Sequence, residues 1–177
     1  MKIQIIGYSG SGKSTLAKFL SQIYNVPLLH LDNTKFYGDW QERTLEEQTE
    51  IVKQFLENNT DWVIDGNYSK ICPERFEMSD MTIYLNFNRF KCLISAYKRY
   101  KKHKHSPRES CPCNDKFDHA FRKWILFDGR TKERKQKHID NLNKTKGKRI
   151  ILKNRRQVNS FIEKCKKEHI NVGDINE

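Results

Sequence analysis

No run of apolar residues in this sequence approaches the roughly 18 that a membrane-spanning helix needs. A secretion signal is also missing, because Gly7 interrupts the first apolar run after only a few residues. The cysteines are odd in number and irregularly spaced, which makes a poor disulfide framework. They are Cys72, Cys92, Cys111, Cys113 and Cys165. We therefore expect a cytoplasmic protein with free thiols and no membrane contact.

Acidic residues are the minority of the charged residues. The chain has 34 Lys+Arg against 22 Asp+Glu, a formal charge of +12, which favours anionic partners such as nucleotides, phosphorylated metabolites or nucleic acid. No helix-turn-helix, zinc-finger or RNA-binding signature is present, so we expect any attraction to nucleic acid to be non-specific and salt-sensitive. A length of 177 residues suits a single domain, residues 1–177, and we expect a monomer or weak dimer.

Short apolar segments alternate with segments of helical periodicity, as in a parallel sheet with crossover helices. The predicted strands are Lys2 to Ile6, Pro27 to Leu31, Trp62 to Ile64, Met81 to Phe87 and Arg149 to Leu152. The predicted helical stripes are Leu16, Phe19, Leu20 and Ile23; Ile51, Val52, Phe55 and Leu56; Phe90, Leu93, Ile94 and Tyr97; and Val158, Phe161, Ile162 and Cys165. Thr44 and Glu47 form a plausible capping box ahead of the second stripe. We expect these stripes to be core in a three-layer α/β fold.

A basic segment interrupts this alternation. "KRYKKHKHSPR", Lys98 to Arg108, leads into "ESCPCND" and a further helical stripe at Phe117, Phe121, Trp124 and Ile125. We predict a basic lid insert at about residues 98–130. Zn²⁺ would accept the side chains of His103, His105, Cys111 and Cys113, but their C-x-C spacing is not that of a zinc knuckle, and free thiols are the favoured interpretation.

The stretch "GYSGSGKST", Gly7 to Thr15, matches G-x-x-x-x-G-K-[ST] at every fixed position and follows an apolar run. In such a P-loop, backbone N–H groups surround the β-phosphate, Lys13 reaches the outer phosphates, and the hydroxyl of Ser14 can bind Mg²⁺. The predicted phosphate-binding residues are Gly7, Ser9, Gly10, Ser11, Gly12, Lys13, Ser14 and Thr15. The motif alone leaves kinases, GTPases and DNA-handling ATPases open.

Two acidic residues follow apolar segments, Asp32 in "LLHLDNTKFY" and Asp65 in "WVIDGNY". At the carboxyl end of a strand beside the P-loop, a carboxylate lies where Mg²⁺, its waters and a phosphoryl acceptor would be; the alternative for each is a helix cap or a turn. A GTPase would need an Asn/Thr-Lys-x-Asp segment, which is missing, and an ATP-driven motor usually needs a larger sheet. These residues therefore favour a small phosphoryl-transfer enzyme.

The sequence resembles the nucleoside monophosphate kinase branch of the P-loop proteins. Within that branch it is similar to the adenylate-kinase-related family known as DNA topology modulation, or FlaR-related, proteins. The resemblance runs in order over nearly the whole chain and rests on "IIGYSGSGKSTLA", "LLHLDNTKF", "WVIDGNY", "TIYLNFNR", the Cys111-Pro112 pair and "ILKNRRQVNSFI". It implies a P-loop NTPase fold with a five-stranded parallel sheet, and an ATP- and Mg²⁺-dependent kinase with a lid after the fourth strand.

The resemblance also implies roles for individual residues. Asp32 would orient or deprotonate the acceptor, with Tyr68 nearby, and Asp65 would lie near Mg²⁺. The arginines that would close on the transferring phosphate are Arg89, Arg99, Arg130 and Arg134, and Asn154 and Arg155 would contact the adenine. We expect a small nucleotide-like or metabolite acceptor. The family's label leaves open an ATP-dependent, nucleic-acid-associated regulator, and a binding-only pseudo-kinase is a third possibility.

The sequence departs from adenylate kinases after its third predicted strand. Asp-Gly is followed there by Asn67, Tyr68 and Ser69, where adenylate kinases have Phe-Pro-Arg. The arginine that would bind an AMP phosphate is therefore missing at this position. We expect an acceptor other than AMP.

Overall fold

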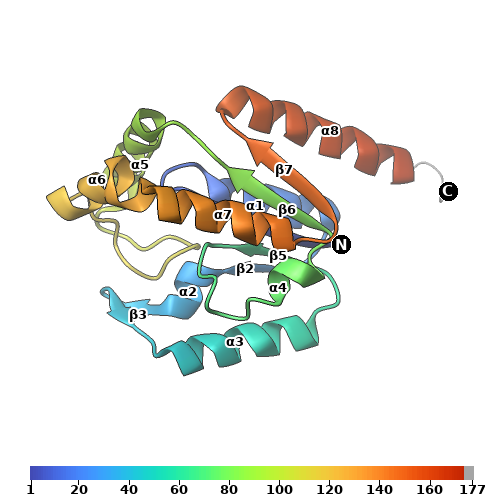
Figure 1. The fold of residues 1–177 in the computed structure, drawn as a ribbon, viewed down its shortest axis with the longest axis horizontal. Helices are drawn as coiled ribbons and strands as arrows, with labels where there is room; N and C mark the ends of the chain where they lie inside the picture. The colour runs from blue at the N-terminus through green and yellow to red at the C-terminus, as the bar shows by residue number, and fades with distance from the viewer. Residues whose placement is uncertain (174–177) are drawn as a thin grey trace.

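The computed structural model describes residues 1–173 of the chain. Its centre is a sheet of five parallel strands (Figure 1). In order across the sheet, these strands are β2 (Leu28–His30), β5 (Trp62–Asp65), β1 (Lys2–Gly7), β6 (Met81–Leu85) and β7 (Lys148–Leu152). All five carboxyl ends meet at one edge because the strands are parallel. The α/β fold with a five-stranded parallel sheet is thus confirmed.

Helices cover both faces of the sheet and complete three layers. In Figure 1, α7 (Lys132–Lys144) passes in front of β6, beside the short α4 (Arg75–Met78), and α1 (Lys13–Tyr24) lies behind the sheet next to α8 (Arg155–Gly173). The helix α3 (Leu45–Asn58) packs along the β2 side, where Val52 joins a buried cluster with Leu31 and Trp62. No helix in the described part of the chain is both long and apolar enough to cross a membrane.

The three central strands, β5, β1 and β6, are almost completely buried because both faces of the sheet are covered there, whereas most of the edge strand β7 is exposed. Ile3, Ile5, Ile83 and Tyr84 are completely buried. The predicted capping box opens α3 as expected, since the hydroxyl of Thr44 accepts the N–H of Glu47 and the Glu47 carboxylate accepts the N–H of Thr44. The stripes predicted on α1, α3 and α8 also pack on the core, with Leu16, Leu20, Val52, Val158 and Cys165 buried.

The prediction that the stripe on α5 (Arg89–His103) is core was wrong for three of its four residues, whereas Leu93 does pack against the core. Phe90, Ile94 and Tyr97 are 61%, 57% and 42% exposed, whereas Cys92 and Ala96 are buried. The backbone of α5 at Cys92 lies directly against Gly10 of the P-loop. So close a contact admits only small side chains on that face, and the large apolar ones point the other way.

Five elements were not predicted from the sequence. After β2 the chain forms the short helix α2 (Leu31–Lys35) and an antiparallel hairpin of β3 (Phe36–Gly38) and β4 (Gln41–Glu42). Asp32 therefore lies in α2, two residues beyond His30 at the end of β2, whereas it was predicted to follow the strand directly. The short helix α4 and, on the far side of the insert, the long helix α7 complete the set.

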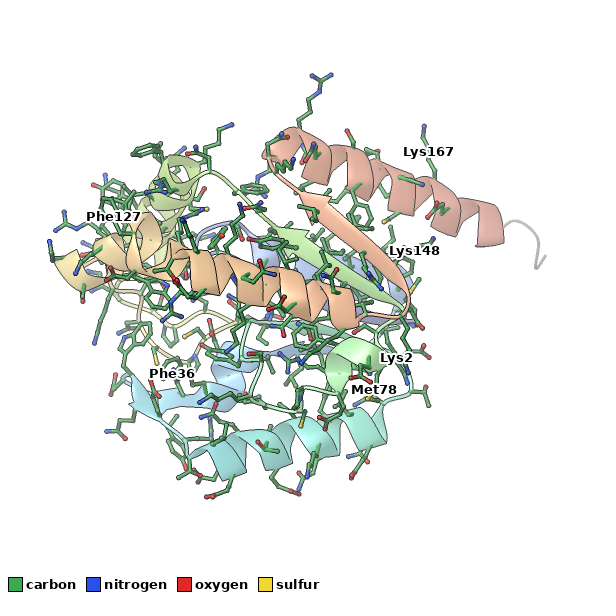
Figure 2. All side chains as sticks on the ribbon, viewed as in Figure 1. Lys2, Phe36, Met78, Phe127, Lys148 and Lys167 are labelled. Atoms are coloured by element: carbon green, nitrogen blue, oxygen red, sulfur yellow. The ribbon has the colours of Figure 1, made fainter. Side chains whose placement is uncertain are left out.

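The basic insert forms part of the compact structure. Beyond α5, residues 104–118, here called the insert loop, lead to α6 (His119–Leu126) and to the 3₁₀ helix η1 (Asp128–Arg130). Trp40 of the hairpin binds the insert loop twice: its N–H donates to Sγ of Cys113 at 3.2 Å, and its Nε1 donates to the carbonyl of Asn114 at 3.1 Å. Figure 2 places Phe36 of the hairpin and Phe127, after α6, at the opposite end of the molecule from Lys2 and Lys148, which begin β1 and β7. The insert loop thus lies at the carboxyl-end side of the sheet.

The ends of β2 and β5 are packed together at Gly66. Gly66 has a φ of +145°, and a Cβ on it would stand 2.7 Å from Cβ of Leu31. Gly38, in the hairpin, has the same φ of +145° but has an open surrounding, because the nearest atom to its Cβ position is 3.9 Å away. A substitution at Gly38 therefore tests the cost of the backbone conformation alone. A substitution at Gly66 tests that cost together with the cost of the close contact.

We expect Gly66→Ala to destabilise the protein more than Gly38→Ala. Both variants place a side chain at an unfavourable φ, at a cost of about 1–3 kcal/mol. Only Gly66→Ala must also displace Leu31, which adds about 1–3 kcal/mol. Urea unfolding of both variants measures the two free energies of unfolding, and equal losses would contradict the tight packing of these strand ends.

Candidate active site

The loop that joins β1 to α1 carries the predicted phosphate-binding motif. Lys13 and Ser14 begin α1, so the free N–H groups and the positive end of the helix dipole face the loop. Nζ of Lys13 donates to the carbonyl of Tyr8 at 3.2 Å, which holds the ammonium group over the loop. Of the other predicted residues, Ser11 is buried, Ser9, Gly10 and Gly12 are half-buried, and Thr15 is exposed.

A side-chain amide fixes the start of the P-loop. Oδ1 of Asn67 accepts the N–H of Gly7 at 2.9 Å, and Nδ2 of Asn67 donates to the carbonyl of Gly7 at 2.8 Å. This two-point contact joins the segment after β5 to the last residue of β1. Asn67 occupies a position where the sequence departs from adenylate kinases, and nothing in the sequence predicted that its side chain would hold the P-loop.

The carboxylate of Asp65 is buried at the end of β5, beside the P-loop. Its Oδ2 lies 3.1 Å from Nδ1 of His30, and both side chains are buried. Burial alone would raise the pKa of Asp65, but the hydrogen bond from His30, the charge of Lys13 and the nearby hydroxyl of Ser14 outweigh burial and lower the pKa. Asp65 is therefore ionised, next to the first two residues of α1.

Two buried oxygen atoms at the loop have no hydrogen-bond partner among the described residues: Oγ of Ser11 and Oδ1 of Asp65. A buried polar atom without a partner usually marks a place where a ligand, ion or water binds. Gly12 has a φ of +93°, which favours glycine, and a Cβ on it would stand 2.9 Å from Nη1 of Arg155, at the flexible end of an exposed side chain. These groups, with the ammonium of Lys13, fit a phosphate chain and a divalent cation that prefers oxygen ligands.

Two of the predicted cationic residues lie against the P-loop, Arg130 and Arg155. The guanidinium of Arg130 stacks 3.8 Å from the ring centre of Tyr8 and donates to the carbonyls of Phe87 and Ile125, each at 2.8 Å. These contacts leave its Nη2 buried and without a partner in the described structure. Arg155 lies beside Gly12 at the start of α8. The two arginines thus approach the P-loop from η1 and from α8.

The remaining predicted cations face other partners. The guanidinium of Arg89 lies over the ring of Phe127, 5.9 Å from its centre, and that of Arg134 lies over Trp124 at 4.4 Å. The side chain of Asn154 accepts the N–H of Gln157 at 3.0 Å and so caps α8. That hydrogen bond gives Asn154 a structural function at the position predicted to contact adenine.

Asp32 and Tyr68, predicted to hold the acceptor, do lie together. The hydroxyl of Tyr68 donates to Oδ1 of Asp32 at 2.7 Å. Burial, followed by the neighbouring charge of Asp32, raises the pKa of Tyr68 well above its ordinary value, so Tyr68 keeps its proton. The ammonium of Lys35 lies 5.3 Å from the centre of the Tyr68 ring. The pair combines a hydrogen-bond acceptor with a donor that stays neutral.

A charged cluster in the insert lies near Asp32. Asp115 is buried and accepts from Nε of Arg99 at 2.9 Å, while Nε of Arg108 lies 3.3 Å from its other oxygen. The pKa of Arg99 is lowered, first by burial and then by the charge of Arg108. The charges of Asp115 and then of Asp32 act in the opposite direction. Arg99 is therefore close enough to Asp32 for the two charges to interact. The sequence did not indicate the roles of Arg108 and Asp115.

The predicted zinc alternative has no counterpart in the described residues, which contain no group of three or more metal-ligating side chains of the His, Cys, Asp or Glu type. The five cysteines are free and buried. Burial raises the pKa of Cys111 to about 11, and the charge of Asp32 adds to this effect. Cys111 and Cys113, in the insert loop, instead pack with Phe36 and Trp40 of the hairpin.

No protein-family model matches the chain, and no curated protein sequence matches it. Among solved structures, a shikimate kinase from Bacteroides thetaiotaomicron is similar with a TM-score of 0.53 and 18% identity, over 93% of this chain and 96% of that one. A gluconokinase from Sinorhizobium meliloti 1021 is similar with a TM-score of 0.50 and 12% identity, over 98% of this chain and 93% of that one. At such identities the likeness establishes the fold alone, an α/β fold with a five-stranded parallel sheet like that of these two proteins.

We expect Asn67→Ala to weaken ATP binding and stability together. The substitution leaves the N–H and carbonyl of Gly7 without their partners, at a cost of about 1–3 kcal/mol, and frees the start of the P-loop. Calorimetric titration with ATP should show affinity about tenfold lower or more, the equivalent of about 1.4 kcal/mol.

Asn59→Ala is the matched control for this prediction. Nδ2 of Asn59 also donates to a backbone carbonyl, that of Phe55 at 2.7 Å, but it does so at the end of α3. That variant should lose stability and keep its affinity for ATP. If the two variants bind ATP equally well, the amide of Asn67 does not position the P-loop.

A buried histidine packs against the P-loop from α7. The ring of His138 lies edge-on to Tyr8, with centres 5.4 Å apart, and 5.1 Å from the ring of Tyr84. Burial, and then the charge of Lys13 and of neighbouring cations, lowers the pKa of His138 from 6.5 to about 4. The folded protein therefore keeps this imidazole neutral where the unfolded chain would take up a proton.

Stability should fall on acidification because of His138. Between pH 6.5 and about pH 4 the unfolded chain binds a proton that the folded chain does not, so stability is lost as the pH falls through this window, by about 3 kcal/mol. We expect His138→Phe to lose less stability than the unsubstituted protein between pH 7 and pH 4.5 in urea unfolding. His119→Phe, at an exposed position in α6, should keep the original pH dependence, and parallel curves for all three proteins would refute the assignment.

Proposed function

We propose that this protein is an ATP- and Mg²⁺-dependent kinase of the nucleoside monophosphate kinase type that phosphorylates a small nucleotide-like or metabolite acceptor. One observation carries the proposal: the hydrogen-bonded pair of Asp32 and Tyr68 lies on the same edge of the sheet as the P-loop, with the buried carboxylate of Asp65 on the strand between them. A phosphate-binding loop with a separate acidic acceptor position is the arrangement that phosphoryl transfer needs.

The donor side of the reaction would use the P-loop and its cations. The N–H groups at the start of α1 and the ammonium of Lys13 would bind the phosphates of ATP, with Arg130 and Arg155 at the two sides of the loop. Ser14 and Asp65 would hold Mg²⁺, directly or through water. The cation, when bound, would neutralise charge on the transferring phosphoryl group. The guanidinium of Arg130 is already fixed by two carbonyls and the ring of Tyr8, so it would need little reorganisation to contact a phosphate oxygen.

The acceptor side would depend on Asp32. Its carboxylate would accept the proton of an acceptor hydroxyl while Tyr68 donates to its other side and fixes its orientation. Arg99 would meet an anionic part of the acceptor, with Arg89 and Arg134 closer to the solvent-exposed rim. This arrangement supports the proposed relationship to the adenylate-kinase-related, FlaR-related proteins, and it leaves the acceptor to be identified by experiment.

Transfer of label from [γ-³²P]ATP tests the proposal. Incubation with a panel of nucleotides, nucleosides, sugars and small hydroxy acids should produce a labelled product with at least one acceptor. With that acceptor, Asp32→Asn should lower kcat by about 10²–10⁴-fold, because the amide cannot accept the proton, and should leave ATP affinity nearly unchanged. Lys13→Met should lose ATP binding itself.

The same assay contains the result that would refute the proposal. ATP binding without transfer to any acceptor would assign the protein to the binding-only class. Transfer that continues at the full rate in Asp32→Asn would refute the proposed role of Asp32. A surface control is Lys167→Met, an exposed position on α8 that Figure 2 places far from Phe36 and Phe127. That variant should behave as the unsubstituted protein.

A further inference from the structure

We propose that His30 is a positioning residue that fixes the carboxylate of Asp65 so that one of its oxygens faces the metal of bound Mg-ATP. This inference rests on the proposed function only as far as the binding of ATP with Mg²⁺, and it does not depend on which acceptor is phosphorylated. No role was predicted for His30 from the sequence, although it stands in "LLHLD" two residues before Asp32.

The sheet itself places the two residues side by side. His30 is the last residue of β2, Asp65 is the last residue of β5, and they are register partners in neighbouring parallel strands. Their side chains therefore leave the sheet on the same face. Both are buried, with exposed side-chain fractions of 6% and 7%, and Gly66 and Leu31, the next residue of each segment, are packed in contact.

The hydrogen bond between them has a defined direction. Nδ1 of His30 lies 3.1 Å from Oδ2 of Asp65, and an ionised carboxylate can only accept, so the proton is on Nδ1. The lowered pKa of Asp65 agrees with an ionised acceptor. The second oxygen, Oδ1, is buried without a hydrogen-bond partner among the described residues. One oxygen is thus held by the imidazole, and the other stays available.

Without His30 the carboxylate would have another favourable orientation. The last torsion of an aspartate side chain is broad, so its carboxylate turns easily, and the ammonium of Lys13 acts on it from the P-loop. A carboxylate turned toward Lys13 would form an ion pair with the residue that should bind phosphate. The hydrogen bond from His30 opposes that rotation, which keeps Lys13 for the nucleotide and Asp65 for the metal.

Calorimetric titration with a non-hydrolysable ATP analogue, in Mg²⁺ and in EDTA, tests the inference. The ratio of the two affinities isolates the contribution of the metal. His30→Ala should reduce this ratio about tenfold, as loss of a hydrogen bond to a metal-binding group usually does, and should change the affinity in EDTA little. His30→Asn should restore most of the ratio, because Nδ2 of asparagine can replace the Nδ1 donor.

A double-substitution cycle with Asp65→Asn shows whether His30 acts through Asp65. If it does, His30→Ala should have no further effect on the ratio in the Asp65→Asn background. A purely structural histidine would instead weaken binding equally in Mg²⁺ and EDTA. His138→Ala, which removes a buried histidine from the other side of the P-loop, is the control for that behaviour.

The inference is overturned by any of three results: no Mg²⁺ dependence of binding in the unsubstituted protein, an unchanged ratio in His30→Ala, or additive losses in the cycle. These results differ from failure of the proposed function, in which Mg-dependent ATP binding is intact and no acceptor is phosphorylated. Thermal unfolding of each variant confirms that the titrated protein is folded.

Discussion

The buried negative charge of Asp65 is the constraint around which the ends of the strands are arranged. A carboxylate removed from water costs several kcal/mol unless charges and hydrogen bonds compensate for it. The compensation comes from three residues on two separate segments, namely His30 at the end of β2, and Lys13 and Ser14 at the start of α1. Electrostatic interactions with Asp65 therefore hold the P-loop, β2 and β5 together. The same interactions determine both the chemistry of the site and the packing of the strand ends.

The site also shows how a strongly basic chain places its cations. A net charge of +12 would give a diffuse positive surface if all the cations were solvated. Several of them are instead fixed by rings, carbonyls or a carboxylate: Arg130 stacks on Tyr8, and Arg99 and Arg108 share the buried Asp115. Fixed guanidinium groups lose little freedom when an anion binds, so the charge is already organised for a phosphorylated ligand.

The sequence predicted the sheet and the P-loop well because both follow from local patterns. Apolar runs set the five parallel strands, and the motif from Gly7 to Ser14 specified a loop that leads into a helix. Asn67 and His30 could not be predicted because their function depends on strands that are distant in sequence and adjacent in the fold. The prediction for the stripe on α5 failed for a related reason. Periodicity identifies an apolar face of the helix, but the contact of Cys92 with Gly10 decides which face is buried.

The insert loop carries two buried thiols that could report on its movement through covalent modification. Cys111 and Cys113 are each only 1% exposed and lie against the hairpin residues Phe36 and Trp40. Burial holds the pKa of Cys111 at about 11, so the thiol is protonated and unreactive while the loop is in place. An alkylating reagent could reach these sulfurs only after the loop separates from the hairpin. The rate of their modification would then measure how often the insert loop separates from the hairpin on the acceptor side of the site.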